Sequence, residues 1–182
     1  YEVNVIGTIN VLECIRNSKN TKVGIFITTD KCYENKEQVW GYKEIDALGG
    51  YDPYSSSKAA CELLINSWKQ SFLNPNNYAE HGKTLASVRA GNVVGGGDWA
   101  KDRIIPDCIR AIEDNQEIEI RSPKAIRPWQ HVLEPLRGYL LLGQKLTEDP
   151  IKYSGAWNFG PNIDSIETVW KVAEKVIKYY GK

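Results

Sequence analysis

Two short and nearly continuous apolar segments do most to restrict how this chain of 182 residues can fold. One covers residues 23–28 and the other residues 85–89, and each has the length of a strand that is buried on both faces. Residues 3–16 and 54–71, which precede and follow the first segment, repeat apolar side chains at helical spacing. Buried strands that alternate with helices predict an α/β layered fold with a parallel sheet.

The remainder of the chain predicts further elements of both kinds. We expect helices over residues 106–115 and 136–146, and a last helix that Ser165 caps and that runs to about residue 180. Short strands are expected at residues 118–120 and 157–159.

Polar segments directly follow both buried strands. Residues 28–31 read Thr-Thr-Asp-Lys, and residues 89–97 lead from an arginine through an asparagine into three glycines. In parallel α/β sheets, ligands bind beyond the carboxyl ends of the strands. The two segments are therefore expected to contribute to one shared site.

Tyr54 and Lys58 stand four residues apart at the start of the second predicted helix. Side chains with this spacing lie on one helix face, so the lysine ammonium can approach the phenol. A phenol is a poor base at neutral pH, and a neighbouring positive charge favours its ionised form. The pair suggests redox chemistry at an alcohol, although such a pair on a helix surface can also serve only for packing.

Acidic and basic residues balance, with 23 of each in the chain. Proteins that bind nucleic acids or acidic membranes usually have an excess of basic residues. This chain has no such excess, so we expect neither partner. Four scattered cysteines and only two histidines match no metal-binding pattern. Reduced thiols, and the lack of an apolar run long enough to cross a bilayer, predict a cytoplasmic protein without a metal.

Taken in order, four blocks of residues resemble the extended short-chain dehydrogenase/reductase family, and in particular its nucleotide-sugar enzymes. The blocks are Asn-Val-Ile-Gly-Thr at residues 4–8, Thr-Thr-Asp-Lys-Cys-Tyr at 28–33, Tyr-Ser-Ser-Ser-Lys at 54–58 and Arg-Ala-Gly-Asn-Val at 89–93. The match continues through residues 127–132 and 158–160, so it covers nearly the whole chain. The resemblance implies part of a doubly wound, Rossmann-type parallel sheet that binds NAD, with much of a smaller C-terminal substrate lobe.

Within this family, the residues after the first strand are similar to those of the 4,6-dehydratases. These enzymes carry Thr-Asp where this chain has Thr29 and Asp30, whereas epimerases and reductases usually lack the acidic residue. Lys31 stands where many 4,6-dehydratases have Glu, which resembles the branch that acts on CDP-glucose. The resemblance thus implies a lyase that converts CDP-glucose to CDP-4-keto-6-deoxyglucose with NAD.

The resemblance also implies roles for individual residues. Tyr54, aided by Lys58, would remove the O4 proton while C4 is oxidised, and Thr29 would share a hydrogen bond with O4. Asp30 would protonate the departing C6 hydroxyl, unless it is only a turn residue, and burial would have to favour its neutral form. Lys31 would take the C5 proton, hold a water molecule or only neutralise charge. The cofactor would be bound by Tyr54, Lys58 and Thr28.

A second group of residues would bind the nucleotide sugar. Its members by resemblance are Asn92, Arg103, Arg127 and Asn162. The forked donors of Arg127 suit a diphosphate, although a surface ion pair is the simpler interpretation. If Asn92 does not bind the substrate, it is a turn residue before the three glycines.

The resemblance also implies how the chain is organised. Residues 1–92 would be the C-terminal part of the NAD-binding domain, and residues 93–182 mostly a substrate lobe that is interleaved with the sheet and truncated. The family's glycine-rich turn for the NAD pyrophosphate is missing, so we expect a fragment that can be inactive by itself. Family members pair subunits through two helices, here residues 3–16 and 54–71, which implies a homodimer or a higher homo-oligomer.

Alternatives stay open at this point. The enzyme can instead be a 4,6-dehydratase for another nucleotide sugar or a 4-epimerase, since no spacing in the sequence reads a nucleotide base. The chain can also be an inactive fragment that keeps the family residues by descent.

Overall fold

The computed structural model describes residues 1–180, which divide into two compact units. The first unit consists of Tyr1–Ala90 and Pro135–Phe159. The second consists of Gly91–Glu134 and of the described residues from Gly160 onward. Each unit is therefore built from two separate stretches of the chain.

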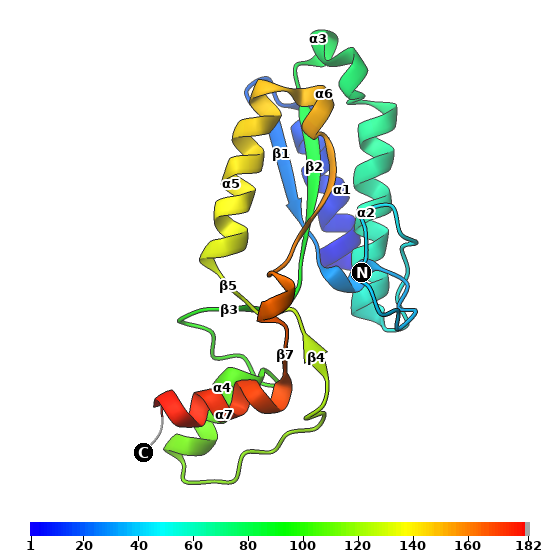
Figure 1. Cartoon of the computed structure of the whole chain (residues 1–182). Coiled ribbons are helices and arrows are strands. Elements are labelled where there is room, and N and C mark those ends of the chain that lie inside the picture. Colours follow the sequence, from blue (N-terminus) through cyan, green and yellow to red (C-terminus); the bar gives the residue numbers. More distant parts are fainter. Residues whose placement is uncertain (181–182) are drawn as a thin grey trace. The chain divides into compact units, whose positions relative to one another are not determined.

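The first unit contains a parallel sheet of three strands in the order β1-β2-β6, of which Figure 1 labels β1 and β2. The strands are β1 (Val23–Ile27), β2 (Thr84–Ala90) and β6 (Gly155–Phe159). Their register pairs Val23 with Thr84 and Ala90 with Phe159. The predicted α/β fold with a parallel sheet is confirmed, including the strand expected near Trp157.

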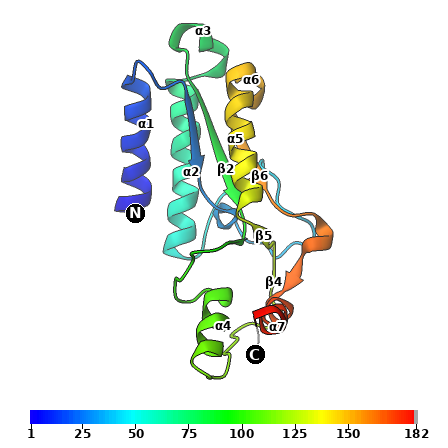
Figure 2. The same cartoon turned by 90° about the vertical axis from the view of Figure 1, so that its left-hand side faces the viewer.

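Helices cover both faces of this sheet, as Figure 2 shows. On one face lie α1 (Gly7–Asn17) and α2 (Pro53–Ser71), and on the other lies α5 (Leu133–Glu148). Side chains of β2 alternate between the two layers, because Leu85 packs with α1 and α2 while Ala86 and Val88 pack with α5. Of the side chains expected in the core from α2, Ile65 is buried in the cluster that contains Leu12 and Leu85, and the partly buried Leu64 and Trp68 pack against that cluster.

Shorter elements complete the first unit. They are a π-helical turn at Glu2–Ile6 that leads into α1, the 3-10 turns at Asp30–Cys32 and Pro75–Asn77, and the short helices α3 (Tyr78–His81) and α6 (Pro150–Tyr153).

The second unit is built around two helices that pack against each other, α4 (Ile104–Glu113) and α7 (Val169–Tyr180). Two small strand pairs accompany them. The strand β3 (Val93–Val94) runs parallel to β5 (Gln130–His131), and β4 (Ile126–Arg127) is antiparallel to β7 (Glu167–Thr168).

Two predictions about the second unit are wrong. Residues 118–120 form no strand: Ile118 and Ile120 are half-buried and Glu119 is exposed, but no strand within residues 1–180 pairs with them. Ser165 does not cap the last helix, since it ends a 3-10 turn at Ile163–Ser165. Pairing of Glu167 and Thr168 with β4 delays the helix, whose first turn is capped by Thr168 Oγ1 accepting from the Lys171 amide at 3.2 Å.

None of the helices in residues 1–180 combines the length and the apolar character that a membrane span requires.

Candidate active site

The segment after β1 turns sharply at the carboxyl end of the sheet. The Thr28 amide still donates to the Val88 carbonyl at 2.9 Å and so continues the parallel ladder. The chain then enters the 3-10 turn at Asp30–Cys32, whose N-cap is Thr29, because the Thr29 hydroxyl accepts from the Lys31 amide at 3.3 Å. This places Thr29 and Asp30 where ligands of parallel sheets bind.

Thr29 and Asp30 are in direct contact. The Thr29 hydroxyl donates to Asp30 Oδ1 at 3.1 Å, and the Thr29 side chain is nearly buried. Asp30 is half-buried and Lys31 is exposed. The turn therefore joins a hydroxyl and a carboxyl that can act on neighbouring atoms of one ligand.

The helix α2 begins one residue before Tyr54, at Pro53. Asp52 caps it by accepting from the Ser55 amide at 2.9 Å, and hydrogen bonds from the Ser55 hydroxyl and then from its amide lower the pKa of Asp52. Gly50 lies against the first turn so closely that a side chain there would come within 2.5 Å of the Ser56 backbone nitrogen. The loop before α2 is thus held tightly at the helix start.

Lys58 lies at the carboxyl end of β1. Its Nζ donates to the carbonyl of Ile27, the last residue of that strand, at 3.5 Å. Tyr54 stands one helical turn earlier, and its side chain is 49% exposed. No hydrogen bond joins the Tyr54 phenol to Lys58 within residues 1–180, since the lysine reaches the strand instead. The structure brings Lys58 to the β1 turn and leaves Tyr54 accessible.

An open cavity of about 400 Å³ adjoins Lys58 in the first unit. It lies between the N-terminal helical segment, β1 and α2, and its lining includes Asn4, Thr8, Ile25, Ile27, Thr28 and Lys58. Apolar walls with an ammonium and a few polar side chains suit a flat ring attached to a sugar. These residues are able to hold part of a dinucleotide.

The four residues predicted to bind the nucleotide sugar all belong to the second unit. The Asn92 carbonyl accepts from the Gln130 amide at 3.0 Å, and Arg103 precedes α4 with its Nε 3.5 Å from Asp98. Arg127 is exposed and donates to the carbonyl of Ile126. The exposed Asn162 begins a 3-10 turn. Their role as a set stays a prediction.

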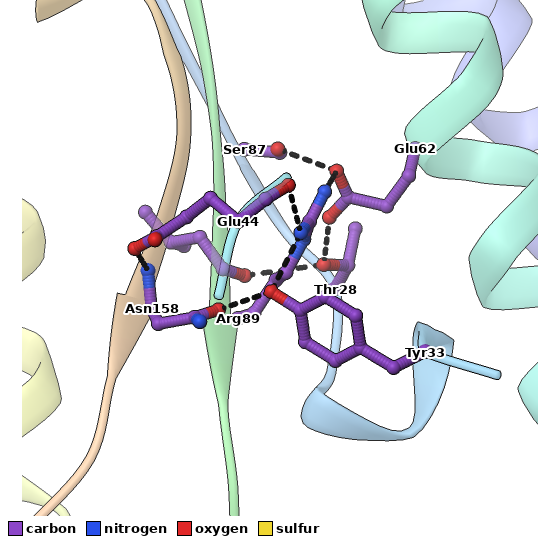
Figure 3. Close-up of polar contacts among 8 residues, drawn as sticks. Thr28, Tyr33, Glu44, Glu62, Ser87, Arg89 and Asn158 are labelled. Carbon is purple, nitrogen blue, oxygen red and sulfur yellow. Dashed lines mark hydrogen bonds and ion pairs between the residues drawn. The ribbon is translucent and has the colours of Figure 1, made fainter. Parts of the chain in front are cut away.

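Sequence reasoning missed a buried ion pair beneath the turn after β1. Glu62 of α2 and Arg89 of β2 lie 2.7 Å apart, with 2% and 4% of their side chains exposed (Figure 3). Burial alone would raise the pKa of the Glu62 carboxyl, but hydrogen bonds from Arg89, Thr28 and Ser87 outweigh it and lower the pKa. Glu62 is therefore ionised at neutral pH.

The ion pair continues into a polar network that reaches β6. The hydroxyl of Tyr33 accepts from Arg89 Nη1 at 2.7 Å and donates to Asn158 Oδ1 at 2.7 Å. Two sequence signals point to this network: an arginine inside an apolar strand requires a buried partner, and Glu62 follows Lys58 by one helical turn.

The cysteine in the turn, Cys32, is not activated. Its side chain is fully buried, and burial raises the pKa of the thiol to about 12. A thiol that stays protonated at neutral pH is a poor nucleophile, so the chemistry of this turn rests on its oxygen groups.

Comparison with known proteins gives a consistent set of relatives. Residues 1–160 match the family described as the NAD dependent epimerase/dehydratase family. The chain is 52% identical over 181 residues to CDP-glucose 4,6-dehydratase of Salmonella typhimurium, covering 100% of this chain and 50% of that protein. It is 24% identical over 194 residues to dTDP-glucose 4,6-dehydratase 1 of Escherichia coli, covering 97% of this chain and 51% of the relative.

Solved structures share the fold. The crystal structure of dTDP-glucose 4,6-dehydratase from Bacillus anthracis in complex with NAD matches with a TM-score of 0.82 at 22% identity, covering 100% of this chain and 53% of the other. UDP-glucuronic acid 4-epimerase from Bacillus cereus matches with a TM-score of 0.81 at 17% identity and the same coverage. The predicted Rossmann-type fold is confirmed, and the chain spans about half the length of the relatives it matches.

Proposed function

The chain belongs to the NAD dependent epimerase/dehydratase family, and from this premise we propose that its protein is a 4,6-dehydratase that acts on CDP-glucose. The observation that carries the proposal is the 52% identity to the Salmonella CDP-glucose 4,6-dehydratase over the whole chain. The contact of Thr29 with Asp30 at the end of β1 supports it, because elimination of water needs an acid beside the groups that oxidise the alcohol. The product would be CDP-4-keto-6-deoxyglucose.

NAD is the proposed cofactor, and the cavity beside Lys58 is its proposed site. The Lys58 ammonium would bind the ribose hydroxyls of the nicotinamide half, with Thr28 and Tyr54 nearby. Bound NAD⁺ would supply the hydride acceptor for C4 and the hydride donor for C6, so the reaction would have no net oxidation.

Oxidation at C4 needs a base for the O4 proton. The accessible phenol of Tyr54 would take this proton, and the positive charge of Lys58 on the same helix face would stabilise the phenolate. Thr29 would hold O4 through its hydroxyl. All three side chains belong to the first unit.

Elimination then removes the C5 hydrogen and the C6 hydroxyl as water. We assign the proton for the leaving hydroxyl to Asp30, whose Oδ1 already accepts from Thr29. Lys31 is exposed beside it and would take the C5 proton, hold a water molecule or neutralise charge. The carbonyl at C4 would make the C5 hydrogen acidic enough for a side-chain base, and Lys31 would have to be a neutral amine to serve as that base.

The nucleotide diphosphate is the proposed ligand of the second unit. Arg127 presents an exposed guanidinium, whose planar fork suits phosphate oxygens. Asn92, Arg103 and Asn162 would complete this group. The division of the chain into an NAD-binding part and a substrate lobe belongs to the same proposal.

We also propose a cytoplasmic homodimer or higher homo-oligomer that pairs through α1 and α2. The four free cysteines agree with a reducing compartment. Exposed apolar side chains such as Ile6, just before α1, and Leu63 on α2 agree with a face that another subunit covers. Light scattering of the purified protein would measure the mass of the assembly.

The function is tested by incubating the complete protein with NAD⁺ and, in parallel, with CDP-glucose or dTDP-glucose. We expect a 4-keto-6-deoxy sugar from CDP-glucose at a higher rate than from dTDP-glucose. A 4-epimer without a keto sugar would instead support an epimerase. A titration of NAD⁺ into the chain of 182 residues accompanies the assay, because the absence of both binding and turnover there would identify an inactive fragment.

A further inference from the structure

The turn that carries Thr29 and Asp30 is attached at both ends to the same buried ion pair. Thr28 precedes the turn and Tyr33 follows it, and both side chains bond to the Glu62–Arg89 pair (Figure 3). The four residues between them, 29–32, include the hydroxyl and the carboxyl of the candidate active site.

At the first end, the Thr28 hydroxyl donates to Glu62 Oε1 and also lies 3.3 Å from the Val88 carbonyl. The other carboxylate oxygen of Glu62 accepts from Arg89 Nη2 and from the Ser87 hydroxyl, each at 2.7 Å. The carboxylate thus joins the end of β1 to the middle of β2. Both oxygens are used within the protein.

At the second end, the hydroxyl of Tyr33 is held between Arg89 and Asn158. The Tyr33 ring stacks on Tyr42 with centroids 5.1 Å apart and planes 14° apart. The Gly49 amide donates to the Cys32 carbonyl at 2.8 Å, which joins the end of the turn to the loop before α2. Tyr33 is only 5% exposed, so its hydroxyl contacts the network rather than solvent.

The helix α2 connects this network to Tyr54 and Lys58. Glu62 follows Lys58 by four residues, so both project from neighbouring turns of one helix face. We propose that the Glu62–Arg89 pair fixes the turn relative to α2, and that Tyr33 is a positioning residue that keeps Asp30 in reach of the C6 hydroxyl. The inference rests on the proposed dehydratase function for its chemical consequence.

The expected consequence is selective. A shift of about 1 Å in a reacting group can lower a rate by about 100-fold. Of the groups assigned to C4 oxidation, Tyr54 and Lys58 are on α2 and only Thr29 moves with the turn, so C4 oxidation should suffer less than elimination. Substrate affinity should change little, because Tyr33 is buried and offers almost no surface for a ligand to contact.

Tyr33→Phe is the test variant, since it removes the hydroxyl and keeps the stacked ring. Tyr42→Phe is its matched control. Tyr42 lies in the same loop, but its hydroxyl contacts Asn35 and Lys36 rather than the ion pair. Both variants are made in the complete protein and measured for hydrogen exchange over residues 29–33, for kcat and KM with CDP-glucose, and for absorbance of reduced nicotinamide during turnover.

We expect Tyr33→Phe to speed exchange in residues 29–33 but not in α2, and to lower kcat between about 10- and 100-fold with an unchanged KM. Reduced nicotinamide should accumulate, because elimination becomes slower than oxidation. Tyr42→Phe should change none of these. Unchanged exchange in Tyr33→Phe, or an equal effect of both variants, would overturn the proposal.

A second pair of variants covers the other end of the turn. Thr28→Val removes the hydroxyl that binds Glu62, and Thr28→Ser keeps it. Faster exchange over residues 29–33 in the valine variant, restored in the serine variant, supports the attachment even if Tyr33→Phe fails to fold. Normal exchange in Thr28→Val would contradict it. Hydrogen exchange is measured without sugar turnover. It therefore tests whether the ion pair holds the turn even if the wild-type protein forms no keto sugar and the proposed function is wrong.

Discussion

The carboxylate of Glu62 and the guanidinium of Arg89 lie 2.7 Å apart between α2 and β2, with almost no exposed side-chain surface. Removal of one partner leaves the other charge buried and uncompensated. We therefore expect Glu62→Ala to lower the free energy of unfolding by about 3–5 kcal/mol, measured by urea denaturation.

An exposed ion pair provides the control for this loss. Lys145 and Glu148 lie 2.6 Å apart on α5, but 38% and 44% of their side chains are exposed. Water solvates either charge when the other is removed, so Glu148→Ala should change stability far less. Equal losses for the two variants would show that burial does not control the contribution of the Glu62–Arg89 pair.

Glu62 should also make stability depend on pH in the acid range. The network lowers its pKa below the ordinary 4.5, so its contribution is fully present above pH 4.5. The contribution is lost as pH falls through the folded-state pKa. Urea midpoints at decreasing pH should show the difference between wild type and Glu62→Gln narrowing below pH 4.5. A difference that stays constant there would contradict an ionised Glu62.

The cysteines should differ in reactivity according to burial. Cys14 is exposed, whereas Cys32 is buried and its pKa is raised to about 12. Iodoacetamide near neutral pH should label Cys14 in the native protein and Cys32 only after unfolding, as mapped by mass spectrometry. Rapid native labelling of Cys32 would show that the turn opens readily.

The Cys32 thiol should also make stability depend on pH in the alkaline range. Because the ordinary thiol pKa is 9.0, the stability that Cys32 contributes should be lost as pH rises from 9.0 toward 12.

Asp30→Asn tests the proposed acid. The amide cannot deliver a proton, so we expect the elimination rate to fall by about 10²- to 10⁴-fold while C4 oxidation continues. Single-turnover measurements with CDP-glucose separate the two steps. Asp46→Asn is the control, because the Asp46 carboxylate accepts from the nearby Lys43 amide at 2.8 Å and lies outside the turn at Asp30–Cys32. Equal slowing of oxidation and elimination in Asp30→Asn would remove the acid role.

The sheet and the turn after β1 were predictable because local patterns determine them. Apolar runs mark β1 and β2, and Pro53 after a capping Asp52 marks the start of α2. The positions of Thr29 and Lys58 at the carboxyl end of β1 follow from the same topology.

The ion pair and the late start of α7 were not predictable in this way. Glu62 and Arg89 are 27 residues apart, and their contact depends on which face of β2 packs against α2. The β7 strand at Glu167 and Thr168 exists only because a distant strand, β4, pairs with it. Such pairings depend on tertiary contacts, so spacing along the chain does not reveal them.

The most direct measurement follows a deuterium atom placed at C4 of CDP-glucose. The complete protein with NAD⁺ is expected to yield CDP-4-keto-6-deoxyglucose with that deuterium at C6, because the hydrogen removed at C4 returns within the same active site. Mass spectrometry and NMR of the product locate the label. Deuterium that remains at C4 of an epimerised sugar, or a keto product without deuterium at C6, would contradict the dehydratase mechanism.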